Sequence, residues 1–443
     1  MNIQLSEHFT YNKLLRFTMP SIVMMVFSSI YGVVDGVFVS NFVGSEAFAA
    51  VNLIMPFLMV LGAVGFMIGT GGSALVSFTL GTGKEQKANE IFSMLIYVLV
   101  AVGAVFTIAG ELLMEPVARF LGADEQMVPV CVTYGRIVLA ALIPFMLQNS
   151  FQSFLVTAER PQFGLYITIA AGVSNIILDA LFIVVFKWGV AGAALATSIS
   201  QFVGGIIPLV YFIAPNKSKL RLRRAKLNLH ILGKTCANGS SEFMTNISMS
   251  VVNMLYNWQL MRLMGADGVA VFGVIMYVNF IFVSIFLGYS IGSAPIVSFH
   301  YGAGHKDELR GLLRKSVLLT AITSVVLTAA ALLLARPLSL IFVSYDAKLL
   351  ETTIRAFSIY ALSFLIVGFN IYASSFFTAL NDGLTSALIS FARTLVFEVA
   401  AVLVLPIIWG IDGVWGAVIA AEALALILSF ICIVKNRNKY GYI

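Results

Sequence analysis

Long apolar stretches separated by short polar clusters run along the whole chain. Each stretch holds roughly 20 to 30 residues, enough for a helix to cross a bilayer. Segments such as 167–186 and 312–334 are apolar on every face, whereas the strands of a membrane barrel alternate apolar and polar residues. We therefore predict an all-α polytopic membrane protein of twelve spans, near residues 13–40, 48–80, 88–112, 127–157, 163–186, 190–214, 230–263, 270–300, 309–333, 350–380, 385–408 and 412–434.

The two halves of the chain repeat each other at one constant offset, the one that separates Gly44 from Gly265. At this repeat offset, without a gap, Gly81 aligns with Gly302, Pro116 with Pro337 and Gly189 with Gly410. Duplication explains this register better than chance does. Six spans per half let both halves enter the membrane from the same side, and parallel repeats of this kind place a substrate path between them, with alternating access.

A basic run between Lys217 and Lys226 lies halfway along the chain. It divides a predicted N-terminal six-helix lobe (1–214) from a C-terminal six-helix lobe (230–443), with a linker over 215–229. The segments on the side of this linker hold most Lys and Arg residues, so the positive-inside rule predicts that both termini are cytoplasmic in a plasma or inner membrane. A nucleic-acid-binding patch is the weaker interpretation of the basic run, and we expect no nucleic-acid partner. We also expect no cleaved signal peptide.

Composition excludes an ordinary soluble domain and gives little support to an enzyme. Of the 443 residues 60% are hydrophobic and 11% charged, with a mean hydropathy of +0.96, against about 25% charged residues in soluble proteins. Three cysteines make neither a disulfide framework nor a metal site. The sequence lacks the His-Glu-x-x-His and Gly-x-Ser-x-Gly motifs. We predict a non-enzyme without a cofactor.

Each ionisable side chain inside a predicted span calls for a functional or structural explanation, because its insertion into the membrane costs at least about 2.5 to 3.5 kcal/mol. Arg136 and Glu242 are expected near span ends, where long side chains reach the interface. Glu398 has two open interpretations, a structural pair with Arg393 or recognition of substrate charge in the C-terminal lobe. The full set is Asp35, Arg136, Asp179, Glu242, Arg393, Glu398 and Glu422.

The N-terminal half holds the most suggestive group. Asn175 and Asp179 are four residues apart and share one helix face. At the repeat offset Asp35 corresponds to Tyr256, Asp179 to Ala400 and Thr197 to Val418, so we expect a polar cluster confined to this half. Two carboxylates, a carboxamide and a hydroxyl favour a proton or cation site over simple hydrogen-bonded helix packing, which remains the alternative.

These residues resemble the multidrug and toxic compound extrusion (MATE) family, nearest its DinF-like branch. The resemblance covers essentially the full length and rests on Pro-Ser-Ile…Tyr-Gly-Val-Val-Asp-Gly from Pro20, on Asn-Ile-Ile-Leu-Asp ending at Asp179, and on Thr197. It implies two pseudo-symmetric six-helix bundles and an antiporter that expels amphipathic, often cationic, drugs or toxic metabolites in exchange for protons or sodium. We expect the protein to be a monomer.

The resemblance also implies site residues. Many relatives have proline after the second aspartate, where this chain has Ala180, which leaves the bending of that helix open. Sodium, at Asp35 and Asp179, is the only metal expected. The implied ion-coupling residues are Asp35, Asn175, Asp179, Thr197 and Tyr134, and the implied N-lobe drug-cavity residues are Tyr31, Asn149 and Gln152.

One further function stays open at this stage, a flippase of the same broad superfamily for a lipid-linked sugar. An anionic headgroup favours several basic residues in the central path, and only Arg136 and Arg393 are candidates. Efflux of small molecules is therefore the preferred hypothesis. The sequence does not separate protons from sodium, because carboxylate, amide and hydroxyl oxygens suit both.

Overall fold

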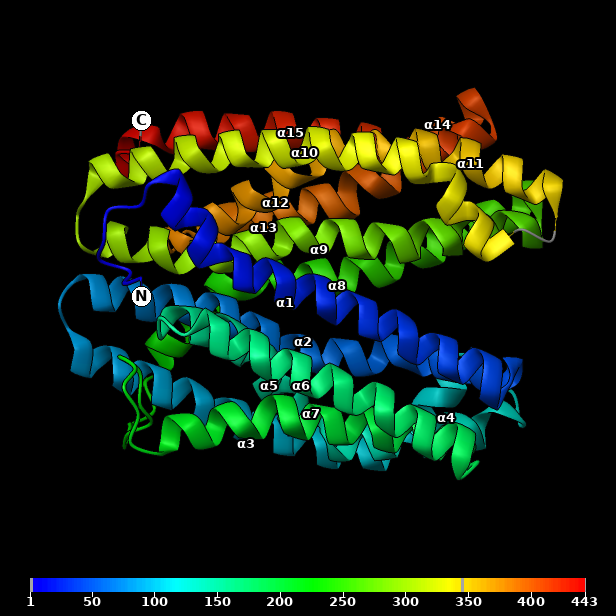
Figure 1. Ribbon diagram of the computed structural model, residues 1–443, viewed down its shortest axis with the longest axis horizontal. Coiled ribbons are helices and arrows are strands. Elements are labelled where there is room, and N and C mark those ends of the chain that lie inside the picture. Colours follow the sequence, from blue (N-terminus) through cyan, green and yellow to red (C-terminus); the bar gives the residue numbers. More distant parts are fainter. Residues whose placement is uncertain (1–2, 344–345, 443) are drawn as a thin grey trace.

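A computed structural model describes residues 3–343 and 346–442, and none of these lies in a strand. Long helices lie side by side, and both chain ends lie at the same end of the bundle (Figure 1). The helices of the first half are α1 (Tyr11–Phe38), the π-helical η1 (Val39–Val43), α2 (Ser45–Gly81), α3 (Glu85–Phe120), α4 (Met127–Ala140), α5 (Leu142–Thr157), α6 (Pro161–Asp179), the π-helical η2 (Ala180–Val185) and α7 (Gly189–Ile213).

The second half repeats this pattern. Its helices are α8 (Leu229–Met264), α9 (Ala266–Gly302), α10 (Lys306–Val343), α11 (Ala347–Ala361), α12 (Phe364–Ala379), α13 (Gly383–Phe391), the π-helical η3 (Ala392–Phe397), α14 (Glu398–Trp409) and α15 (Ile411–Tyr440). Each of the twelve predicted spans falls on one helix or on one consecutive series of helices. The predicted all-helical fold class is confirmed.

Length and apolar character support these spans. Within the described residues, nine helices are long and apolar enough to cross a membrane, and two bent pairs, α4 with α5 (57°) and α11 with α12 (45°), pass the same test together. The break before α5 has a local cause, because Pro144 has no N–H and its ring clashes with the carbonyl of Ala140, where α4 ends. The remaining long helix, α8, is richer in Asn, Ser and Thr.

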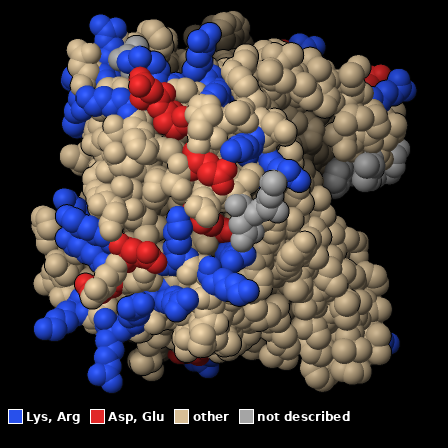
Figure 2. All heavy atoms as spheres, turned by 60° about the vertical axis from the view of Figure 1, so that its left-hand side comes forward, with Lys and Arg blue, Asp and Glu red and all other residues tan. Residues whose placement is uncertain are grey.

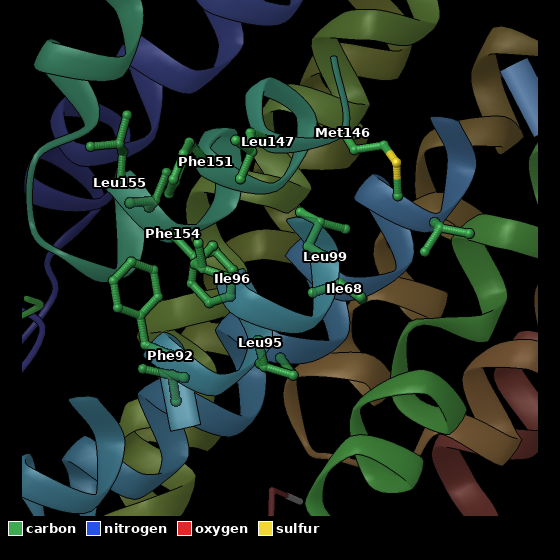
Figure 3. Packing of buried hydrophobic residues seen from close by; sticks show 14 of the residues in the cluster. Ile68, Phe92, Leu95, Ile96, Leu99, Met146, Leu147, Phe151, Phe154 and Leu155 are labelled. Carbon is green, nitrogen blue, oxygen red and sulfur yellow. The ribbon is translucent and has the colours of Figure 1, made fainter. Parts of the chain in front are cut away.

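The hydrophobic core has a part in each half. In the first half, α2, α3 and α5 interlock through side chains such as Ile68, Leu99 and Met146 (Figure 3). The rings of Phe92 and Phe154 pack edge to face with centroids 4.9 Å apart. This packing fixes the orientation of α5, whose polar residues include Asn149 and Gln152. A separate cluster in the second half is built on residues such as Leu260, Phe357 and Trp415.

The two halves meet through α1 and α2 of the first half, which pack against α9 and α8 of the second. Glycines allow the closest approach. A Cβ at Gly81 would meet the backbone of Phe299, and a Cβ at Gly302 would meet the backbone of Phe78. The repeat offset relates the two glycines to each other and the two phenylalanines to each other. The repeat therefore produces a reciprocal backbone contact at the end that carries the N-terminus.

The basic segment between the halves is docked along α3. The backbone N–H of Arg221 donates to Asn89 Oδ1 at 2.6 Å, and that of Arg223 donates to Ser93 Oγ at 2.8 Å. Lys219 forms an ion pair with Glu159 at 2.9 Å. Figure 2 shows that Lys and Arg side chains gather on this end of the molecule, beside a flank that is almost free of charge. This distribution fits a chain that crosses a membrane with one strongly basic end.

Candidate functional site

Four helices of the first half bring the predicted ion-coupling residues together. Asp35 comes from α1, Asn175 and Asp179 from α6, Thr197 from α7 and Tyr134 from α4. The Asp35 carboxylate lies close to the side chains of Asp179, Thr197 and Asn175. Asp179 is fully buried, and Asn175 and Tyr134 are 2% and 1% exposed. The cluster therefore lies in the protein interior and has two carboxylates at its centre.

The local structure of α6 changes at this cluster. The α-helical hydrogen bonding ends at Asp179, and the chain continues as the π-helical segment η2 from Ala180. Single-turn π segments inside helices are frequent at functional sites. The change of helical register occurs with alanine after the aspartate, so proline is not required for an irregularity at this position.

The oxygens of the cluster fit a small cation or a proton. Of the buried oxygens in the described residues that have no partner in hydrogen-bonding geometry, five belong to this cluster, and these are Asp35 Oδ1, Asn175 Oδ1, both carboxylate oxygens of Asp179, and Thr197 Oγ1. An unsatisfied buried polar group costs about 1 to 3 kcal/mol. Oxygen ligands are the set that hard cations prefer. Tyr134 lies beside them, with its hydroxyl 3.8 Å from Met55 Sδ.

A second feature is a central cavity of about 280 Å³ between the two halves. Asn149 and Gln152 line it, as the resemblance implies. Tyr31 is not among the lining residues, and its side chain instead interacts with Gln148 and Ser28. The five predicted ion-coupling residues also lie outside the lining. Ion cluster and cavity are thus separate sites.

The second half contributes a polar cluster that faces this cavity. Arg393 Nε lies 3.2 Å from Glu422 Oε1. Asn370 Nδ2 donates to Glu422 Oε2 at 2.7 Å, and Ser429 Oγ donates to Asn370 Oδ1 at 3.0 Å. The cluster expected around Asp35 has no counterpart at its repeat-equivalent positions, such as Tyr256 and Ala400, but the second half holds a polar cluster of its own at other positions. Asn370 is the repeat counterpart of Asn149, a signal from which it could have been found.

Two further expectations about this half need correction. Arg393 pairs with Glu422 on α15 and not with Glu398. Glu242 lies more than three turns from either end of α8 and lines the cavity, so it is not a span-end residue. Glu398 also lines the cavity and interacts with Tyr256. It directly follows η3, just as Asp179 directly precedes η2.

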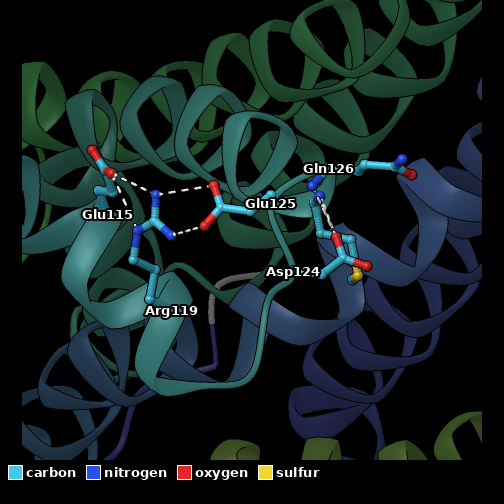
Figure 4. A network of polar contacts seen from close by, with 6 residues as sticks. Glu115, Arg119, Asp124, Glu125 and Gln126 are labelled. Atoms are coloured by element: carbon cyan, nitrogen blue, oxygen red, sulfur yellow. Dashed lines mark hydrogen bonds and ion pairs between the residues drawn. The ribbon is translucent and has the colours of Figure 1, made fainter.

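Other charged groups belong to surfaces. Arg136 has a half-exposed side chain whose Nε lies 3.6 Å from Glu111 Oε2. Figure 4 shows Arg119, in the last turn of α3, between Glu115 of the same helix and Glu125 in the loop that follows. The ion pair with Arg119 lowers the pKa of the fully exposed Glu125. Exposed pairs of this kind contribute little to stability, and they lie outside both candidate sites.

Comparisons with known proteins agree with this architecture. The multidrug export protein MepA of Staphylococcus aureus (strain MRSA252) is 20% identical over 430 residues, which cover 97% of this chain and 94% of that protein. MepA of Staphylococcus haemolyticus (strain JCSC1435) is 21% identical over 434 residues, with 98% and 95% covered.

Solved structures show the same fold at low sequence identity. The outward-facing conformation of a multidrug resistance MATE family transporter of the MOP superfamily has a TM-score of 0.93 and 22% identity, with 100% of this chain and 99% of that chain covered. A MOP superfamily transporter from Pyrococcus furiosus has a TM-score of 0.89 and 21% identity, with 98% and 97% covered.

A family model described as MatE matches residues 20–181 and 243–403. The two matched segments fall in the two halves and together span well over half of the chain. The chain therefore belongs to the MATE family of multi-pass membrane transporters.

Proposed function

We propose that this protein is a cation-coupled antiporter of the DinF-like branch that exports amphipathic, often cationic, small molecules. The observation that carries the proposal is the cluster of five unpartnered buried oxygens around Asp35 and Asp179, set apart from the central cavity in the part of the chain that the structure describes. Two separate sites allow a transporter to bind an ion at one place and a larger compound at the other. The relatives named multidrug export proteins support the cargo class.

The chain's own residues suggest how the ion cluster controls the cavity. When bound, a proton or sodium ion would supply one positive charge to the carboxylates of Asp35 and Asp179. Asp35 lies on α1, and Thr18 and Ser21 on the same helix abut Gly292 and Gly288 of the other half. Neutralising Asp35 removes repulsion from Asp179. The loss of this repulsion at one end of α1 then alters the contact between the two halves at the other end of the same helix.

The charge balance of the cavity supports cationic cargo over an anionic lipid headgroup. The described lining residues include three carboxyl groups, on Glu242, Glu398 and Glu422, and one guanidinium, on Arg393. That guanidinium already pairs with Glu422. A flippase for a lipid-linked sugar would need several unpaired basic groups here.

The proposed orientation in the membrane rests on the basic end of the molecule. We propose that both termini are cytoplasmic in a plasma membrane, because both lie at the basic end of the molecule (Figures 1 and 2). We also propose lobes over 1–214 and 230–443 joined by the 215–229 linker. A monomer suffices, because the ion cluster and the cavity are each built from one chain.

Efflux from proteoliposomes tests the proposal. A pH gradient and a sodium gradient are imposed separately while export of a cationic dye is followed. Wild-type protein should respond to at least one gradient, and Asp35→Asn should abolish that response while the protein still folds and reconstitutes. Gradient-driven export by correctly reconstituted Asp35→Asn protein would eliminate this mechanism.

A further inference from the structure

The central cavity contains more carboxyl groups than cationic groups, and its one described guanidinium is held at a particular carboxylate. Glu242, Glu398 and Glu422 face Arg393 in the lining. Resting on the proposed export of cationic compounds, we propose that Arg393 is a specificity-determining residue. Its tethered positive charge neutralises Glu422 and leaves the carboxyl groups of Glu242 and Glu398, so that a second positive charge on a compound gains less in this cavity than it would without Arg393.

Hydrogen bonds from Asn370 hold the Glu422 carboxylate of this ion pair in place. Asn370 donates to Glu422 Oε2 at 2.7 Å and to the Glu422 carbonyl at 2.9 Å. Ser429 in turn donates to Asn370 at 3.0 Å. The Glu422 side chain is 7% exposed and that of Arg393 is 14% exposed. Charges removed from water to this degree interact more strongly than surface charges, so the pair can influence any ligand in the cavity.

The arginine is held less firmly than the glutamate. Its Nε lies 3.2 Å from Glu422 Oε1, yet the N–H does not point at that oxygen and has no hydrogen-bond partner within the described residues. A bidentate arginine–carboxylate pair would be stronger and more rigid. Arg393 also lies within the π-helical segment η3, where regular α-helical hydrogen bonding is interrupted. The guanidinium therefore acts mainly through its charge.

The repeat indicates that the fold itself does not require this ion pair. At the repeat offset, Arg393 corresponds to Gly172 and Glu422 to Gln201. The first half thus builds the same spans with two uncharged residues. The charges are an addition specific to the half that lines the cavity with acids, which points to ligand selection and away from packing.

A matched pair of dyes tests the inference by direct binding. Ethidium and propidium share one aromatic cation, and propidium has a second positive charge on its side chain. Their dissociation constants are measured by fluorescence on detergent-purified full-length protein. In Arg393→Gln the affinity for propidium should rise roughly tenfold more than the affinity for ethidium, because the second charge meets one more unpaired carboxylate.

Further variants separate charge from structure. Glu422→Gln should move the propidium-to-ethidium ratio in the opposite direction, and the double variant Arg393→Gln/Glu422→Gln should restore it. Arg393→Lys should leave the propidium-to-ethidium ratio at its wild-type value. Arg136→Gln, which removes the surface arginine paired with Glu111, is the matched control and should leave the ratio unchanged.

The outcomes distinguish this inference from the proposed function. Equal changes for both dyes in Arg393→Gln, or a double variant whose ratio stays shifted, would refute the role of Arg393. Should Arg393→Gln fail to fold, an unshifted ratio in Glu422→Gln would refute it equally. Wild-type protein that binds neither dye would instead count against the export of cationic compounds.

Discussion

Replacing Gly302 by alanine should separate the two halves at the end that carries the N-terminus. A Cβ at this position would lie 2.9 Å from the carbonyl carbon of Phe78 and 3.0 Å from its Cα, and closer still to its oxygen. Ordinary van der Waals contacts begin near 3.4 Å, so even the two carbon contacts would be too short. The obstructing atoms are backbone of α2 and cannot rotate away as a side chain can.

The size of the effect follows from this overlap. Inserting a methyl group into a packed contact typically costs about 1 to 3 kcal/mol. The cost applies only in the conformation in which α2 and α9 touch at this point. The ratio of separated to closed molecules should therefore rise by roughly 5-fold to 150-fold.

Distances between two spin labels measure the shift. Labels are placed at the exposed positions Gln86 and Asp307, after α2 and α9 respectively, in a background without the three native cysteines. Gly302→Ala should add a population at longer distance. Gly273→Ala is the control, because it lies on the same helix and its Cβ would meet no atom within 4 Å. Identical distance distributions for both variants and the wild type would refute the reasoning.

Three more predictions follow from other parts of the structure. Asp35→Asn and Asp179→Asn should each abolish gradient-driven efflux, and the double variant should be scarcely worse than either, since residues of one site act non-additively; additive losses in the liposome assay would speak against a single site. Single cysteines at Lys219 and Asp346 should react with an impermeant reagent from opposite sides of the membrane, and labelling of both from outside intact cells would overturn the proposed topology. Burial alone raises the pKa of Asp382, but hydrogen bonds from the Tyr440 hydroxyl (2.6 Å) and the Thr385 N–H outweigh it and hold that pKa below its usual value. The stabilisation that this carboxylate contributes is present above about pH 4 and is lost as the pH falls through the lowered pKa. Asp382→Asn should therefore lower the free energy of unfolding by about 1 kcal/mol at pH 7 and by progressively less in acid. Thermal unfolding of both proteins at several pH values can check this.

The spans were predictable because apolar length is a direct physical requirement of the bilayer. The break between α4 and α5 was missed, although Pro144 marks it. The repeat offset relates Gly81 to Gly302, but it does not tell which backbone each glycine touches. That information depends on how the halves face each other, which no local pattern records.

The two sites differ in how well the sequence predicts them. Asp35 and Asp179 stand out because isolated acids are costly in a span. The pairing of Arg393 with Glu422 was missed because Glu398 is nearer in sequence. Residues five apart do not share a face of a regular α-helix, but Arg393 lies in the π-helical segment η3, so this spacing does not decide its partner. The true partner lies on another span, and sequence spacing carries no information about it.

Separation of the ion cluster from the cavity implies that coupling and selection can be changed independently. In the proposed mechanism Asp35 acts through α1, which abuts Gly292 of the other half through Thr18, and it needs no contact with the transported compound. Arg393 faces the cavity and has no contact with the ion cluster among the interactions described above. Arg393→Gln should therefore change which compounds are bound while the response to an imposed gradient persists. Loss of that response in a protein that still binds both dyes would show that the C-terminal carboxylates also take part in coupling.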